Sequence, residues 1–154
     1  MSTHSAIVRK NKDGSYTGIY CHWDGYPSNN GKVLLDHYKT DEKIDSLIAL
    51  GDISSLNEFV TPDASRETAK TDSPYQKVDL TKPHSFDNVY NDTTIAYHRD
   101  RGGELVKHEG ESLIAVLSQI DHEYAYVWVD GNWEVWGSDW VNAISIEDAI
   151  KLTS

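Results

Sequence analysis

The densest group of reactive side chains is Tyr20–Pro27, with the sequence Tyr-Cys-His-Trp-Asp-Gly-Tyr-Pro. It places a thiol, an imidazole, a carboxylate and three aromatic rings within eight residues, at the expected end of a strand. Alternation along a strand puts Cys21 and Trp23 on one face of the sheet. Tyr20 and His22 then point to the other face. These groups suit a ligand pocket, in which rings stack on a planar group and polar side chains bind its edge.

The same motif has a purely structural interpretation. A strand that ends in a turn would bury Trp23 and Tyr26 in the core. Asp24 would then cap the turn, and Gly25 would adopt a positive φ. The sequence leaves both interpretations open.

Two further chemistries, nucleophilic catalysis and metal binding, are disfavoured by the spacing. A nucleophilic Cys21 needs a neighbouring base, but His22 faces the other side of the strand and only His37 is left as a candidate. Zinc sites need about four convergent ligands, and the seven histidines form no recognisable pair motif. We therefore expect no catalytic residue, no metal and no cofactor, and a hydrolase using Cys21 or a histidine is the least favoured function.

A second candidate segment is Tyr97–Gly103, which carries two closely spaced arginines, Arg99 and Arg101. Their guanidinium groups suit phosphate or carboxylate. The alternative is that they pair with nearby acids, such as Asp100 and Glu104, on a solvated loop.

Four tryptophans gather near the end of the chain, at positions 128, 133, 136 and 140. Cross-strand pairing and core packing explain such rings. An exposed patch for a partner protein or a stacked base is the alternative.

The charge of the chain limits its partners. With 154 residues and a net charge of −11, it suits one domain, residues 1–154, that does not bind nucleic acid directly or anionic membrane. From His108 to Ile150 there are nine acidic residues and no Lys or Arg. This acidic stretch either keeps the protein soluble or forms a face that imitates DNA or meets a basic protein.

The expected compartment is the cytoplasm. No apolar run approaches the ~20 residues that span a bilayer, and the first residues lack the basic and apolar regions of a signal peptide. The single cysteine, Cys21, fits a reducing environment.

The pattern of apolar residues predicts five strands and four helices. The strands are Ser2–Arg9, Tyr16–Trp23, Thr93–His98, Tyr124–Val129 and Asn132–Trp136. The helices follow Ser28 or Asn29 up to Tyr38, follow Thr40 up to Gly51, and cover Glu111–Ile120 and Ser145–Leu152.

Turn signals at Asn11–Gly14 and Asp130-Gly131 predict two hairpins, and residues 61–83 form an irregular excursion. Arg99–Gly103 is expected to be a charged loop. The predicted fold class is α+β, an antiparallel sheet of hairpins with helices packed on one face.

Several segments together resemble a group of small uncharacterised proteins encoded by bacteriophages and prophages. They are Tyr20–Pro27, Gly31, His37-Tyr38, Leu50–Leu56 and Ala96–Gly102. The likeness spans residues 1–140, and its most specific part is the His-Trp-Asp-Gly-Tyr-Pro motif. The resemblance implies a phage accessory protein in the host cytoplasm that inhibits host defence.

The preferred hypothesis is a non-catalytic protein that sequesters a nucleotide-like small molecule. The predicted ligand-binding residues are His22, Trp23, Asp24, Tyr26, Tyr97, Arg99 and Arg101. The rings would stack on a base and the arginines would hold phosphates. The alternative is an acidic inhibitor or DNA mimic that blocks a basic surface of a host enzyme. Homo-oligomer formation is left open.

Overall fold

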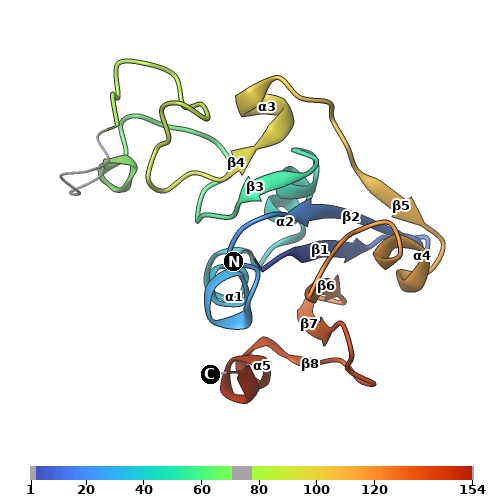
Figure 1. Cartoon of the computed structure of the whole chain (residues 1–154). Coiled ribbons are helices and arrows are strands. Elements are labelled where there is room, and N and C mark those ends of the chain that lie inside the picture. Colours follow the sequence, from blue (N-terminus) through green and yellow to red (C-terminus); the bar gives the residue numbers. More distant parts are fainter. Residues whose placement is uncertain (1–2, 71–77, 154) are drawn as a thin grey trace.

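The computed structural model describes residues 3–70 and 78–153 (Figure 1). The strands are β1 (Ser5–Lys10), β2 (Tyr16–Cys21), β3 (Ile53–Ser55), β4 (Ile95–Ala96), β5 (His108–Gly110), β6 (Tyr124–Val129), β7 (Asn132–Gly137) and β8 (Ile144–Ser145). The α-helices are α1 (Lys32–His37), α2 (Asp41–Ile48), α3 (Tyr97–Arg101), α4 (Leu113–Leu117) and α5 (Ile146–Thr153). A π-helix turn, η1 (Pro27–Gly31), precedes α1, and a 3₁₀ turn, η2 (Glu67–Ala69), lies in the excursion.

The predicted α+β class is confirmed, with one sheet of eight strands in the order β4-β3-β2-β1-β6-β7-β8. β5 also pairs with β2. The sheet is mostly antiparallel, but the pairs β1–β6 and β2–β3 run parallel. The β1–β6 pair is parallel because the two hairpins, β1–β2 and β6–β7, join through their first strands, which have the same direction.

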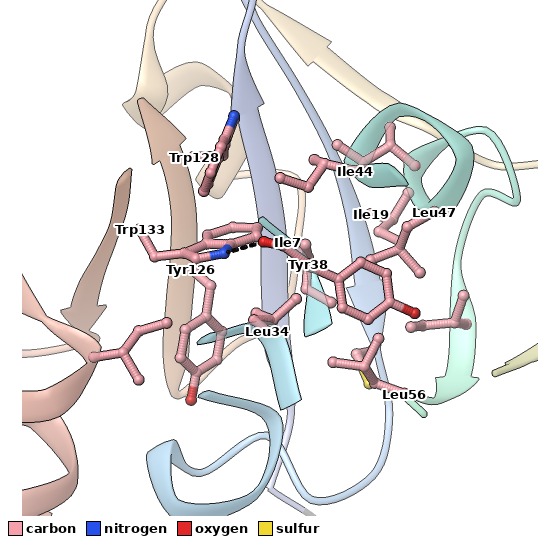
Figure 2. Close-up of a cluster of buried hydrophobic side chains, with 14 of the residues drawn as sticks. Ile7, Ile19, Leu34, Tyr38, Ile44, Leu47, Leu56, Tyr126, Trp128 and Trp133 are labelled. Atoms are coloured by element: carbon pink, nitrogen blue, oxygen red, sulfur yellow. Dashed lines mark hydrogen bonds between the residues drawn. The ribbon is translucent and has the colours of Figure 1, made fainter. Parts of the chain in front are cut away.

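Helices cover both faces of the sheet, so the prediction of helices on one face is wrong. Side chains of α1, α2 and α5 pack with one face in the larger apolar cluster (Figure 2). α4 packs on the other face through Val116 and its neighbours, in a smaller cluster that includes Val8 and Val127. A central strand buried on both faces shows apolar residues at successive positions. Ala6, Ile7 and Val8 of β1 are of this kind, each with no exposed surface.

The two predicted hairpins are confirmed, as are the helix caps at Thr40 and Ser145. β1 and β2 pair through six residues each, and so do β6 and β7. Asp130 and Gly131 close the second hairpin with φ values of 51° and 80°, as a type I′ turn requires. Thr40 and Ser145 accept hydrogen bonds from Lys43 N and Asp148 N at the starts of α2 and α5.

Two predictions near η1 and α3 are wrong. Neither Ser28 nor Asn29 caps a helix with its side chain, because the chain passes through η1, with Pro27 at its first position, and runs on into α1. The predicted strand Thr93–His98 shrinks to Ile95–Ala96, and the predicted loop after it is α3. The Asp100 carboxylate accepts the Ala96 backbone N–H at 2.7 Å, which supports this helical turn at its start.

The excursion between β3 and β4 projects from the end of the sheet (Figure 1). Its predicted irregular character is confirmed for residues 61–70 and 78–83, where η2 is the one helical turn; residues 71–77 lie outside the described residues, as does Ser2 of the first predicted strand. Within residues 3–70 and 78–153, no helix has the length and apolar character needed to cross a membrane.

Candidate functional site

The motif after β2 is held in place by its backbone. After β2 ends at Cys21, His22 N donates to Ile53 O and Trp23 N to Ser54 O, so the segment stays bonded to β3. Gly25 N donates to Thr3 O, and Gly25 O accepts the buried Tyr126 hydroxyl at 2.6 Å. The segment is therefore a rigid platform, as a binding site requires.

The predicted alternation of side chains is confirmed for Tyr20, Cys21 and His22. It is wrong for Trp23, which is predicted on the face of Cys21 but contacts the His22 ring, because β2 ends at Cys21. Cys21 is buried in the larger apolar cluster, whereas the Tyr20 ring packs against the smaller one on the other face. The Tyr20 hydroxyl oxygen lies 2.6 Å from His22 Nδ1, so both side chains share one face.

Four rings gather on this face, and we call His4, Tyr20, His22 and Trp23 the ring cluster. The register pairs Ser5 with Cys21, which brings His4 beside His22. The two imidazole centres are 4.8 Å apart, and the Trp23 ring stands edge-on to His22 at 4.7 Å. These separations are typical of aromatic contacts. Trp23 remains 46% exposed and offers its ring to solvent.

Hydrogen bonds link Tyr20 to His22 and His4 to Asp121 in the ring cluster. Burial, with smaller effects from Tyr97 and Asp121, raises the pKa of Tyr20 to about 12. The phenol therefore keeps its proton at neutral pH, and it can donate to His22 Nδ1 in the tautomer that carries the imidazole N–H at Nε2. His4 Nδ1 lies 2.7 Å from the Asp121 carboxylate, which can only accept, so His4 donates there.

Tyr97, from the second predicted segment, lies next to this face. Asp52 connects the two: its carboxylate accepts Tyr20 N at 2.9 Å, and its carbonyl accepts Tyr97 N at 3.3 Å. The same carboxylate lies 3.2 Å from His108 Nε2. The structure therefore brings His22 and Trp23 into contact and connects the Tyr97 backbone to that of Tyr20 through Asp52.

Arg101 remains available to a ligand. Its guanidinium lies over the Phe86 ring at 5.7 Å, and Phe86 packs against Tyr97 at 5.6 Å. Among residues 3–70 and 78–153, no carboxylate lies within ion-pair distance of Arg101. We call Tyr97, Phe86 and Arg101 the Tyr97 stack.

Arg99 is used inside the protein, which contradicts its predicted role as a phosphate ligand. Its guanidinium donates to Thr94 O at 2.7 Å, to Val60 O, and to both Asp100 oxygens at 2.9 and 3.1 Å. The Asp100 side chain is 1% exposed, and the buried His84 side chain lies 3.4 Å from it. Arg99 thus neutralises a buried carboxylate and holds the excursion to α3.

The structural interpretation of Trp23 and Tyr26 is wrong, because both rings are exposed and neither fills the core. Asp24, and not Gly25, adopts the positive φ, at 55°. Gly25 is needed for another reason: a Cβ there would lie 2.7 Å from Ser5 Cβ. Asp24 and Tyr26 are exposed. The Tyr26 ring makes no ring contact with the four members of the ring cluster.

Cys21 is unsuited to nucleophilic attack. It is fully buried, and burial raises the pKa of its thiol to about 11. Asn30 Nδ2 donates to its sulfur at 3.3 Å. His37, the other candidate base, lies 3.4 Å from Glu58. In the described parts of the chain, no three His, Cys, Asp or Glu side chains gather as metal ligands would.

The four tryptophans near the end of the chain differ in burial. Trp128 and Trp133 belong to the larger apolar cluster, so an exposed patch containing these two rings is ruled out. Trp136 and Trp140 are half-buried. By contrast, the nine acidic residues between 108 and 150 are all exposed.

Sequence reasoning missed His4, Asp121, Asp52 and Phe86. The position of His4 could have been predicted from the β1–β2 hairpin, because extending its register by one pair places His4 opposite His22. Asp121 lies 117 residues from His4 in the chain, so no local sequence pattern predicts that contact. No model of a known protein family, no curated protein and no solved structure matches the chain.

Proposed function

We propose that this chain is a non-catalytic binding protein that takes up a nucleotide-like ligand on the ring cluster. The observation that carries the proposal is the exposed Trp23 ring, fixed edge-on against His22 beside the hydrogen-bonded Tyr20–His22 pair. A base that stacks on an exposed aromatic ring gains about 1–3 kcal/mol.

Polar recognition would come from His22. With Nδ1 occupied by Tyr20, its Nε2–H can donate to a ring nitrogen or a carbonyl oxygen of the base. The fixed backbone after β2 means that little ordering entropy is lost on binding.

Arg101 is the guanidinium we assign to a phosphate, in place of Arg99. The acidic total charge does not prevent this, because charges beyond a Debye length of about 8 Å are largely screened. Two carboxylates lie beside the cluster. Asp121 contacts the His4 imidazole, and Asp52 contacts the His108 imidazole.

The biological setting of this proposal comes from the resemblance to phage-encoded proteins. A phage protein that sequesters a nucleotide signal in the host cytoplasm would inhibit host defence. This setting depends on the resemblance alone, and the binding chemistry stands without it.

The first test is native mass spectrometry of the purified chain, followed by titration with nucleotides monitored by Trp fluorescence. A co-purifying or titrating nucleotide supports the proposal. Trp23→Ala should weaken its binding about 5- to 150-fold, and Trp23→Phe should restore much of it because a ring remains. Equal binding by Trp23→Ala would overturn the assignment of the site. Turnover of the nucleotide would instead favour a His-centred hydrolase.

A further inference from the structure

A groove separate from the ring cluster opens along the other end of the sheet. It has a volume of about 840 Å³ and lies between α1, the β6–β7 hairpin, β8 and the start of α5. Its apolar lining comes from Leu35, Ile144 and the two indoles of Trp128 and Trp133. The proposed function makes no use of this groove.

The two indoles that line the groove are held rigidly. Trp133 Nε1 donates to Tyr38 O at 2.9 Å, the dashed line in Figure 2, and Trp128 Nε1 donates to Asp41 Oδ1 at 2.8 Å. The rings meet at 5.2 Å in an edge-to-face arrangement. Trp128 and Trp133 are 6% and 8% exposed, so their rings form a fixed floor of which the groove reaches only a small part.

The charged lining of the groove is mainly acidic. Asp36, Glu134 and Glu147 line it, against Lys39 as the one cation among its described lining residues. Asp36 pairs with Lys32 at 3.1 Å, whereas Glu134 and Glu147 have no cation within ion-pair distance among residues 3–70 and 78–153. These two exposed carboxylates are thus available to an incoming cation.

We propose that the groove binds an arginine-bearing segment of a partner protein. An arginine side chain can lay its aliphatic stem along Leu35, Ile144 and the exposed parts of the two indoles, while carboxylates accept its guanidinium N–H groups. The surroundings favour the same partner, since the chain from His108 to Ile150 holds nine acidic residues and no Lys or Arg. Such a field accelerates the approach of a basic surface.

The test uses a blocked hexapeptide with two arginines as the probe, and the same peptide with citrulline in their place as its control. Binding is followed by NMR at the indole N–H signals of Trp128 and Trp133, at low and physiological salt. Glu134→Gln/Glu147→Gln should lower the affinity about tenfold. The matched control, Glu111→Gln/Glu123→Gln, makes the same change of charge outside the groove and should alter it less than about twofold.

Lys39→Gln provides a test of opposite sign, because removing the cation should raise the affinity about threefold. Equal losses of affinity in the two double variants would mean that only the overall charge matters, and would overturn the site. Equal binding of the arginine and citrulline peptides, or indole N–H signals that do not shift, would overturn it as well. Trp23→Ala should leave peptide binding unchanged, so this proposal and the nucleotide proposal succeed or fail separately.

Discussion

Two regions of the molecule are held together by different kinds of contact. The sheet with α1, α2 and α5 closes around apolar side chains, such as Ile7, Leu34 and Leu47, that have no exposed surface. The polar segment, residues 57–70 and 78–101, closes around buried carboxylates. Asp92 accepts hydrogen bonds from Arg66 at 2.9 Å, Thr93 at 2.8 Å and Thr68.

The difference explains why composition misleads in the polar segment. A stretch rich in Thr, Asp, Ser and Lys suggests a mobile or ligand-binding loop, yet many of its polar groups bind one another. Asn88 alone bonds to Asp79, Lys82 and Pro83. A buried polar network is stable only when its members are satisfied, so single changes there should be costly.

The largest effect should come from Asp100→Ala. This change leaves the Arg99 guanidinium without its carboxylate and the Ala96 N–H without its acceptor, and breaking a buried pair costs about 3–5 kcal/mol. We expect the free energy of unfolding, measured by urea denaturation, to fall by that amount. Asp87→Ala, an exposed change in the same segment, is the control. Equal stability of both variants would mean that the network does not hold the segment.

Arg99 and Arg101 form the next comparison. Arg99→Gln removes charge-assisted hydrogen bonds to Asp100 and should reduce the free energy of unfolding by about 1.5–3 kcal/mol. Arg101→Gln should leave stability unchanged and weaken nucleotide binding. Denaturation and ligand titration of both variants measure the two effects. A stable Arg99→Gln variant that loses only ligand affinity would restore Arg99 to the binding site.

Lowering the pH should destabilise the polar segment, because Asp100 becomes protonated. Burial alone would raise the pKa of this carboxyl, but hydrogen bonds from His84, Arg99 and the Ala96 N–H lower it to about 2. Because the folded pKa is depressed from 3.8, the stabilisation is present above pH 4 and is lost as the pH falls toward 2. The loss amounts to about 2 kcal/mol, measurable as a shift of the urea midpoint. Asp100→Asn should flatten this part of the pH profile.

The elements with strong local signals could be predicted from the sequence. Asp130-Gly131, Thr40 and Ser145 mark a turn and two caps by short-range chemistry alone. β5 could not be found in this way, because its three residues carry no period and pair with Tyr16–Gly18, far away in the chain. The parallel β1–β6 pairing likewise depends on long-range contacts.

The candidate site was predictable in part for the same reasons. Alternation along the strand decides the direction of His22. It does not decide that of Trp23, because β2 ends at Cys21 and the Trp23 ring turns to the side of His22. If Arg99 and Arg101 lay in a loop, as the sequence predicted, nothing would distinguish the roles of the two guanidinium groups. On a helix, however, residues two apart do not share a face, so once α3 forms, one arginine turns to Asp100 and the other to Phe86.

The smallest expected effect concerns Cys21, which is buried in the larger apolar cluster with its sulfur near Ser54 O of β3. Burial raises the pKa of its thiol to about 11, so the thiolate that reacts with electrophiles is scarce at neutral pH. We expect slow modification by a thiol reagent in the native state and rapid modification in urea. Cys21→Ala should reduce stability by about 1 kcal/mol and leave nucleotide binding intact, since the sulfur faces away from Tyr20 and His22. Fast native labelling accompanied by loss of binding would show that Cys21 is accessible and takes part in the site.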